Sequence, residues 1–261
     1  MARSTFYYYL KKIGQPGKYK DIEEVIKQIY HENRGRYGYR RITLEMHKRG
    51  YKINHKTVLK LMNKCGLKCC VRVRKYRSYK GTIGKVAPNL LQRNFNAEKP
   101  NEKWVTDVTE FSLFGKKLYL SPILDLYNSE IISYNISEKP TFYPIIDMLN
   151  KAFCKIPDNT NLILHSDQGW QYQMKKYQNM LKDKGIKQSM SRKGNCLDNA
   201  VVENFFGLLK SELLYLQDFK SIEHFKKELI EYIDYYNNNR IKCKLKGLSP
   251  VQYRAQSNKV A

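Results

Sequence analysis

The sequence lacks a long apolar run and the N-terminal pattern of a secretory signal, so neither a membrane span nor export is indicated. Its six cysteines, at 65, 69, 70, 154, 196 and 243, form no regular framework of pairs, and we expect reduced thiols in a cytoplasmic protein. Three of them lie near His55, but the paired CxxC and HxxxH spacings of a zinc site are missing. Structural zinc is therefore not expected.

Acidic residues are scarce: the chain has 24 Asp and Glu against 48 Lys and Arg. The imbalance is concentrated in residues 1–100, with 25 basic and 6 acidic residues, whereas residues 101–261 hold 23 and 18. So one-sided a charge favours a polyanionic partner. A solvated, lysine-rich surface is the alternative. At 261 residues the chain is long enough for one sizeable domain and a smaller one.

Residues 40–66 predict two short helices joined by a glycine-containing turn. The first helix is expected over 41–48, and the second runs from its cap, Asn54, to Lys64. This order is typical of a helix-turn-helix that binds DNA. The second helix would present Lys56, Lys60 and Lys64 on one face, where they could contact phosphates. An ordinary helical hairpin with a solvated lysine face is the alternative.

A basic run at 68–81 alternates cations with aromatic and β-branched residues. Such a run can follow a DNA backbone, and the predicted contacts are Arg72, Arg74 and Arg77. Residues 1–80 are thus interpreted as a small, all-α DNA-binding region with a basic extension. Residues 81–101, with two prolines and two glycines and little periodicity, predict a linker.

Residues 102–218 alternate β-patterned and helical runs, and 219–261 predict a C-terminal helical extension. The first three β-patterned runs have short connections, which indicates an antiparallel meander. By pattern alone the domain is α/β with a mixed sheet. Five strands are expected, at 103–111, 117–125, 130–136, 162–164 and 186–189.

Three carboxylates stand where two strands and a helix could bring them together. Asp107 lies in the first strand, Asp167 follows the strand at 162–164, and Glu203 sits beside the apolar stripe of a later helix. Two Mg²⁺ ions held by carboxylates can activate a nucleophile and stabilise the leaving oxygen of a phosphodiester. We expect these three acids to be catalytic metal ligands. Taken singly, each acid is more often a surface residue.

Four neighbouring residues receive other interpretations. Lys210 lies two helical turns after Glu203 and could reach a phosphate beside the metals, with an ordinary surface lysine as the alternative. Asp198 is predicted to cap the helix, and Glu110 to lie outside the site. His165 is expected to pack in the core.

The order Asp, Asp and, after thirty-five residues, Glu resembles the DDE transposases of the retroviral integrase superfamily. Within it, the chain is most similar to the second-reading-frame products of bacterial insertion sequences. The likeness spans nearly the whole chain. The motifs that carry it lie at 33–41, 165–172, 199–210, 236–240 and 248–254.

This resemblance implies a ribonuclease H-like catalytic core over 102–218, with Mg²⁺ as cofactor and Mn²⁺ as a substitute. It implies metal-dependent cleavage at the ends of the element followed by strand transfer. The implied partners are double-stranded DNA of the ends and target, further copies of the chain in a homo-multimer, and an upstream-frame protein, separate or fused by frameshifting. The family also has a basic residue at the position of Lys210.

Two other classes of protein share parts of the pattern. A DNA-binding regulator would explain residues 1–80 and the charge, but not three acids at catalytic spacing. A ribonuclease H-type nuclease would share the acids and the fold without strand transfer, and a preference for RNA–DNA hybrids would distinguish it. A chain with intact acids can also be inactive if its end-recognition part is missing.

Overall fold

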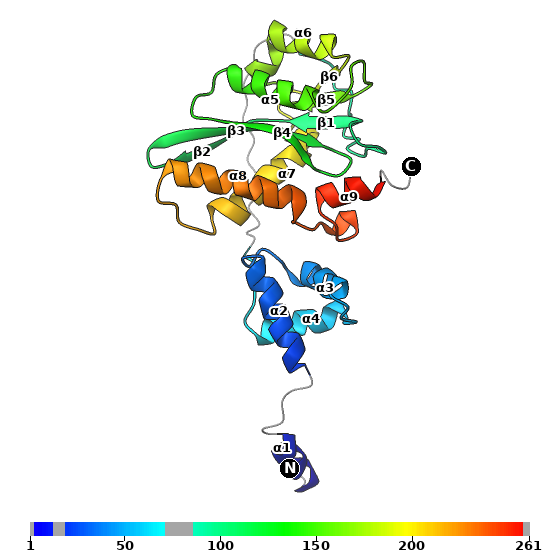
Figure 1. Ribbon diagram of the computed structural model, residues 1–261, viewed down its shortest axis with the longest axis vertical. Helices are drawn as coiled ribbons and strands as arrows, with labels where there is room; N and C mark the ends of the chain where they lie inside the picture. Colours follow the sequence, from blue (N-terminus) through cyan, green and yellow to red (C-terminus); the bar gives the residue numbers. More distant parts are fainter. Residues whose placement is uncertain (1–2, 13–18, 71–85, 258–261) are drawn as a thin grey trace. The chain divides into compact units, whose positions relative to one another are not determined.

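The computed structural model describes residues 3–12, 19–70 and 86–257, and the chain divides into two compact units, Met1–Cys70 and Val71–Ala261. The described part of the first unit is helical (Figure 1). Its helices are α1 (Arg3–Lys12), α2 (Lys20–Glu32), α3 (Tyr39–Lys48) and α4 (His55–Lys64).

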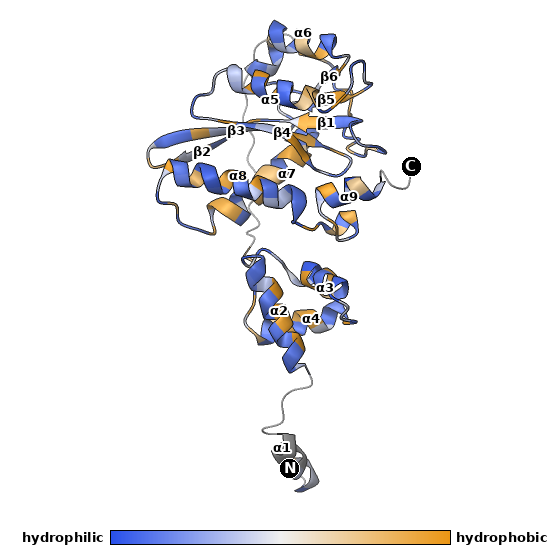
Figure 2. Ribbon diagram, viewed as in Figure 1, coloured by the Kyte–Doolittle hydropathy of each residue, from blue (hydrophilic) through white to orange (hydrophobic). Residues whose placement is uncertain are grey.

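Helices α2, α3 and α4 share a small aliphatic core. The hydrophobic residues of each helix recur at helical spacing, and their side chains are buried, among them Ile26, Ile29, Ile42, Met46 and Val58. Figure 2 shows the hydrophobic residues of these helices turned toward one another. The core therefore follows from the apolar stripes alone.

The connection between α3 and α4 is built as the sequence predicts. Gly50 adopts φ 88°, and the N–H of Tyr51 donates to the C=O of Met46 at 3.0 Å, which ends α3 in a left-handed turn. The side chain of Asn54 accepts from the N–H of Lys56 at 2.8 Å and caps α4. The predicted helix-turn-helix-like region is confirmed.

The second unit is organised around a mixed sheet. Its strands are β1 (Lys103–Thr106), β2 (Thr109–Leu113), β3 (Lys116–Asp125), β4 (Ile131–Ser137), β5 (Ile163–Ser166) and β6 (Lys187–Met190). β3 pairs antiparallel with β1, β2 and β4, whereas β5 pairs parallel with both β1 and β6. The expected meander therefore continues into a parallel half.

The strand predicted at 103–111 is two strands, so the described residues form six strands and not five. β1 and β2 pair with β3 in one continuous register. The gap between them, Asp107 and Val108, faces Pro122, which has no N–H to donate. The C=O of Pro122 accepts from the hydroxyl of Thr106 at 2.8 Å. The interruption thus leaves Asp107 outside the regular ladder.

Helices cover both faces of the sheet (Figure 1). One face carries α5 (Tyr143–Phe153) and α6 (Lys175–Asp183), and the other carries α7 (Ala200–Leu209) and α8 (Ile222–Asn238). Consecutive residues of β1 serve the two layers: Trp104 packs in the core with Met148 of α5, and Val105 in the core with Phe225 of α8. The helix α8, at the start of the predicted extension 219–261, therefore shares a core with the sheet.

Short helical turns complete the second unit. They are η1 (Trp170–Gln173), η2 (Cys196–Asn199), a π-helical turn η3 (Lys210–Leu214), η4 (Cys243–Leu245) and the final helix α9 (Pro250–Ser257). η1 begins three residues after Asp167, and η3 begins at Lys210. Two of these turns therefore border predicted site residues.

Residues 86–101, predicted as part of the linker, pack along the second unit. Leu91 is buried in the core beneath α7 and α8, and the N–H of Leu90 donates to the hydroxyl of Ser189 at 2.9 Å. Residues 71–85, which hold the rest of the predicted linker and part of the basic run, lie outside the described residues. The predicted domain limits stay predictions.

Candidate active site

Asp107 lies in the gap between β1 and β2. Val105 and Phe111 both belong to the core beneath α7 and α8, and the two-residue period of a strand places Asp107 on that same side. Its carboxylate Oδ1 accepts from the N–H of Val108 at 2.7 Å. The side chain is half-buried. The break in the strand thus turns an acid toward the layer that contains Glu203.

Asp167 directly follows β5, and its carboxylate is fixed by the turn that comes next. The N–H of Gly169 donates to Asp167 Oδ1 at 2.9 Å. A Cβ at Gly169 would lie 2.9 Å from the same oxygen and 2.5 Å from Nε2 of Gln171. Only glycine therefore fits at this position without displacing the carboxylate or the amide.

Glu203 lies in the first turn of α7, and Lys210 follows the last turn. Both side chains are half-buried. Nζ of Lys210 lies 5.7 Å from the centroid of the Phe111 ring. Hydrogen bonds with Lys117 and Tyr119 lower the pKa of Glu110, and the charge of Lys210 lowers it further. Lys210 therefore reaches across to β2, the strand that follows Asp107.

The charges of the other two acids act on Asp107. Burial raises the pKa of Asp107 well above its ordinary value, and the charges of Asp167 and Glu203 raise it further. The N–H of Val108 and the charge of Lys210 oppose this rise. Burial also raises the pKa of Asp167. The fold thus brings Asp167, Glu203 and Lys210 close enough to Asp107 for their charges to act on it.

The carboxylates do not form a finished metal cage. Within the ranges that the structure describes, no three or more His, Cys, Asp or Glu side chains are arranged so that they could hold a metal ion. The five described free cysteines, Cys65, Cys69, Cys70, Cys154 and Cys243, form no such group either. Any ion at the three acids must therefore complete its coordination from elsewhere.

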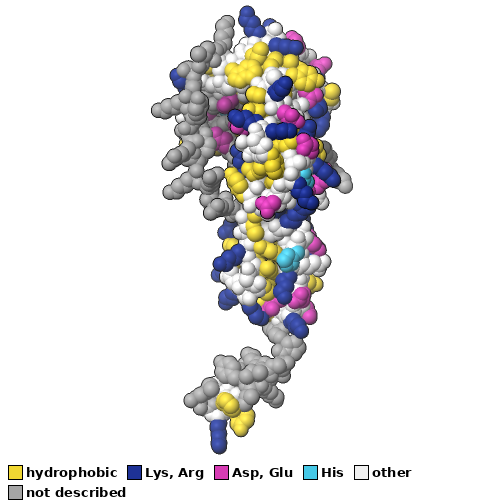
Figure 3. All heavy atoms as spheres, turned by 90° about the vertical axis from the view of Figure 1, so that its left-hand side faces the viewer, with side chains coloured by type: hydrophobic (Ala, Val, Ile, Leu, Met, Phe, Trp, Pro, Cys, Tyr) yellow, Lys and Arg dark blue, Asp and Glu magenta, His cyan; other side chains and the backbone are white. Residues whose placement is uncertain are grey.

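The predicted DNA-binding residues outside the site fall into two groups. Lys56, Lys60 and Lys64 are exposed on α4, and Lys64 donates to Glu23 at 2.6 Å. Arg72, Arg74 and Arg77 lie outside the described residues. On the face shown in Figure 3, Lys and Arg side chains are spread over the surface with Asp and Glu between them. Charge alone therefore marks no single interface there.

The prediction for Asp198 is wrong. Its side chain makes no capping hydrogen bond to α7 or η2, because both oxygens are used elsewhere. Nε of Arg192 donates to Oδ2 and Nε of Arg93 donates to Oδ1, each at 2.9 Å. The hydrogen bond from Arg192 is the main cause that lowers the pKa of Asp198. This acid joins the residues before β1 to the loop before α7.

His165 is buried, as predicted, with Nδ1 2.8 Å from the hydroxyl of Ser189. Burial lowers its pKa to about 4, so the ring is neutral at neutral pH. The side chain therefore packs in the core beside β6.

The sequence did not predict a buried ion pair that involves the turn after α7. Arg240 donates to Glu212 through Nε at 2.7 Å and Nη2 at 2.6 Å, and the Tyr232 hydroxyl donates to the same carboxylate at 3.0 Å. The side chains of Arg240 and Glu212 are 1% and 0% exposed. Glu212 belongs to the π-helical turn that begins at Lys210. The pair thus holds the turn that follows the Glu203 helix.

A second arginine, Arg254 of α9, pairs with Asp125 at the end of β3 and lies 2.8 Å from Glu130. Asp125 is 129 residues away in the chain, and the partner of Arg240 is 28 residues away. Both arginines close motifs that the sequence shares with the family. Their place in these motifs could have marked both arginines as important, but the sequence does not show which acids they pair with.

Family models match most of the chain. Residues 97–196 and 203–257 each match an integrase core domain, and residues 18–76 match an HTH-like domain. The putative transposase InsK for insertion sequence element IS150 of Escherichia coli (strain K12) is 59% identical over 257 residues, 98% of this chain and 91% of the relative. The chain belongs to the insertion-sequence transposases with an integrase core. The transposase is thus a polynucleotidyl transferase, as the sequence predicts.

More distant relatives agree. The transposase for insertion sequence element IS904 of Lactococcus lactis subsp. lactis (strain IL1403) is 36% identical over 234 residues, covering 89% of this chain and 92% of the relative. The cryoEM structure of a simian T-cell lymphotropic virus intasome in complex with PP2A regulatory subunit B56 gamma matches with TM-score 0.50 and 17% identity, over 88% of this chain and 74% of that chain. This likeness supports the predicted ribonuclease H-like fold of the transposase. No helix in the described part is long and apolar enough to span a membrane.

Proposed function

We propose that the transposase cleaves DNA at the ends of its insertion sequence and joins the freed strand to a target, with Asp107, Asp167 and Glu203 as ligands of Mg²⁺. The observation that carries this proposal is the electrostatic effect of two of the acids on the third. Besides burial, the charges of Asp167 and Glu203 raise the pKa of Asp107. Carboxylates that repel one another in a half-buried site are stabilised by a divalent cation.

The chemistry of the donor set fits Mg²⁺, with Mn²⁺ as a substitute. Mg²⁺ prefers oxygen ligands, keeps several waters and takes oxygens from the substrate phosphate, so it needs no closed protein cage. Asp107, Asp167 and Glu203 would offer oxygen ligands only. When bound, two such ions would activate the attacking water or hydroxyl and stabilise the leaving oxygen.

The other residues of the chain would bind and orient the DNA. Lys210, which lies close enough to Asp107 to lower its pKa, would neutralise a phosphate beside the acids. The N–H of Gly169 would hold the Asp167 carboxylate in its orientation. The cations proposed to contact the duplex backbone are Lys56, Lys60, Lys64, Arg72, Arg74 and Arg77.

The transposase would act as a homo-multimer, because one reaction must join two ends of an element and a target. An upstream-frame protein, as a separate partner or a fusion, would supply further recognition of the ends. Both partners are predictions from the family resemblance.

The test is cleavage and joining of labelled duplexes that carry the element's terminal repeats, with Mg²⁺ present. Asp167→Ala and Glu203→Gln should each lower both reactions by at least about 100-fold, since even outer-shell partners of a metal are worth about 10–100-fold. Glu110→Gln is the matched control. Glu110 lies three residues after Asp107, is exposed and pairs with Lys117 at 3.1 Å.

Each outcome separates the proposal from its rivals. Full activity of Asp167→Ala would remove this acid from the reaction. DNA binding without any reaction by the unaltered chain, even with the upstream-frame protein added, would favour a DNA-binding regulator. Cleavage of RNA–DNA hybrids without joining would favour a ribonuclease H-type nuclease.

A further inference from the structure

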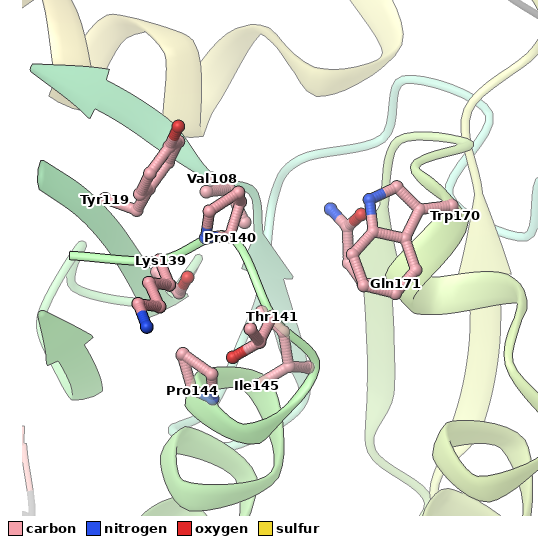
Figure 4. Close-up of a pocket in the computed structure, with 10 residues that line it drawn as sticks. Val108, Tyr119, Lys139, Pro140, Thr141, Pro144, Ile145, Trp170 and Gln171 are labelled. Carbon is pink, nitrogen blue, oxygen red and sulfur yellow. The ribbon is translucent and has the colours of Figure 1, made fainter. Parts of the chain in front are cut away.

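A pocket of about 210 Å³ opens in the second unit. Its walls come from three places: the strands at Val108 and Tyr119, the segment from Lys139 to Ile145, and the η1 turn at Trp170 and Gln171 (Figure 4). Val108 directly follows Asp107, and Trp170 lies three residues after Asp167. Two of the walls therefore belong to the same stretches of chain as Asp107 and Asp167.

One wall of this pocket carries an exposed aromatic side chain, Trp170. Trp170 is 52% exposed, whereas the other tryptophan of the chain, Trp104, is 0% exposed. Tyr143, next to the lining residue Pro144, is 72% exposed. Large aromatic faces exposed to water at a pocket are typical of ligand contacts, since leaving them uncovered forfeits much apolar burial.

The turn that carries Trp170 is held in place from both ends. The N–H of Gly169 donates to the Asp167 carboxylate at 2.9 Å, and the amide of Gln188 donates to the C=O of Tyr172 at 2.7 Å. Trp170 is therefore positioned relative to an acid of the site, although its own indole is exposed. A ligand stacked on this indole would lie next to the reacting phosphodiester.

The chemistry of the lining favours one class of ligand. None of the lining residues is acidic, and the polar groups among the apolar walls include the Lys139 ammonium, the Gln171 amide and the Thr141 hydroxyl. An ammonium suits a phosphate, an amide suits the edge of a base, and an indole suits its face. A flat, anionic ligand that offers all three is a nucleotide.

We propose that this pocket takes an unpaired base of the DNA strand next to the cleaved phosphodiester, stacked on Trp170, with Lys139 on the adjoining phosphate. The inference rests on the proposed function, because it assumes that DNA reaches the three acids. It adds a determinant of substrate form: ends with an unpaired base bind better than fully paired ends. The energy of stacking would offset the cost of separating the base from its partner.

Intrinsic fluorescence tests the proposal, because Trp104 is buried and a change on DNA binding reports on Trp170. The probes are a duplex with a short unpaired tail and the same duplex with abasic sugars in the tail, without divalent cation so that no reaction occurs. The intact tail should quench the emission and the abasic tail should not. Trp170→Ala should weaken binding of the intact tail by about 5- to 100-fold and leave binding of the abasic tail unchanged.

Two further variants keep the test independent of folding. Trp170→Phe retains an aromatic face and should bind the intact tail with intermediate affinity. Phe114→Ala removes another exposed aromatic side chain, which does not line the pocket, and should bind like the unaltered chain. Equal quenching by both tails, or equal affinity of Trp170→Ala for the intact tail, would overturn the proposal.

The outcome also separates this inference from the proposed function. Selective quenching by the intact tail in a chain that never cleaves its ends would support the pocket while the proposed reaction fails. Cleavage that depends on Asp167 but ignores abasic tails would support the reaction and refute the base pocket.

Discussion

The two units of the transposase handle charge in opposite ways. In the first unit the described core is aliphatic, and charged side chains such as Lys56 and Lys60 are exposed on α4. In the second unit several charges lie inside: Glu212 and Arg240 are almost fully buried, and Asp125 is buried against Arg254. The first unit thus keeps its cations available to a polyanion, whereas the second uses ion pairs to hold its own elements.

This difference has a physical reason. Helices α2 to α4 pack through their apolar stripes and bury no charged side chain of their own, although Arg36 in the connection between α2 and α3 is buried. The acids of the second unit lie at the junction of a sheet with a helix, and burial raises the pKa of Asp107 and of Asp167. Where elements hold like charges close together, stabilising contacts elsewhere in the same elements must offset the repulsion. The buried pair that follows Lys210 supplies such a contact.

The largest expected effect tests this contrast directly. Arg240→Met leaves the Glu212 carboxylate buried without its cation, which typically costs about 3–5 kcal/mol of unfolding free energy. The matched control is Arg49→Met in the first unit. It breaks a 2.5 Å pair with Glu32 whose side chains are 30% and 43% exposed, and such pairs are worth about 0–1 kcal/mol. Urea unfolding of both variants measures the difference, and equal losses would contradict the comparison.

Gly169→Ala should lower cleavage with little change in stability. The added Cβ would lie 2.9 Å from the Asp167 oxygen, and a displacement near 1 Å at a reacting site can cost about 100-fold in rate. Gly207→Ala is the control, because its added Cβ meets no atom within 4 Å. Single-turnover cleavage and melting temperature are the measurements. Normal cleavage by Gly169→Ala would show that the turn does not position Asp167.

Asp107→Asn should be more stable than the unaltered chain at neutral pH. This gain in unfolding free energy should be smaller than the loss expected for Arg240→Met. Burial and the like charges of Asp167 and Glu203 raise the folded-state pKa of Asp107, so its ionisation opposes folding. The stability that protonated Asp107 contributes to the folded chain is fully present at low pH and is lost as the pH rises through the raised pKa. The gain in Asp107→Asn should therefore shrink as the pH falls.

The measurement is the unfolding free energy of both chains from acid to neutral pH without divalent cation. An exposed acid elsewhere serves as control: Glu110→Gln should show no such gain. A stability difference that is the same at every pH would show that charge at Asp107 is not its source.

The smallest effect concerns the lysines of α4. Lys60→Ala should reduce the dependence of duplex binding on salt, by about 0.9 in the slope of log K against log salt concentration. Lys64→Ala should reduce it less, because Lys64 already donates to Glu23 at 2.6 Å. Fluorescence anisotropy across a salt series measures both slopes. Unchanged slopes in both variants would remove α4 from the DNA interface.

Local signals predicted much of the fold. The helix at Tyr143–Phe153, the cap at Asn54 and the helix-turn-helix-like region follow from periodicity and capping, which act over a few residues. The break at Asp107 was missed, because it depends on Pro122 in a neighbouring strand. Asp198 was misassigned because its carboxylate binds two arginines, Arg192 six residues away and Arg93 105 residues away, and does not cap the helix.

The sequence by itself determined the aliphatic stripes of α2 to α4, the excess of cations in residues 1–100, and the order of the three acids. Tertiary structure alone decided that the charges of Asp167 and Glu203 act on Asp107, that Arg240 neutralises Glu212, and that Trp170 stands exposed at a pocket. Helix stripes and caps depend on neighbours within one or two turns. Buried charge and pockets depend on which distant residues the folded sheet brings together, and no local pattern records that.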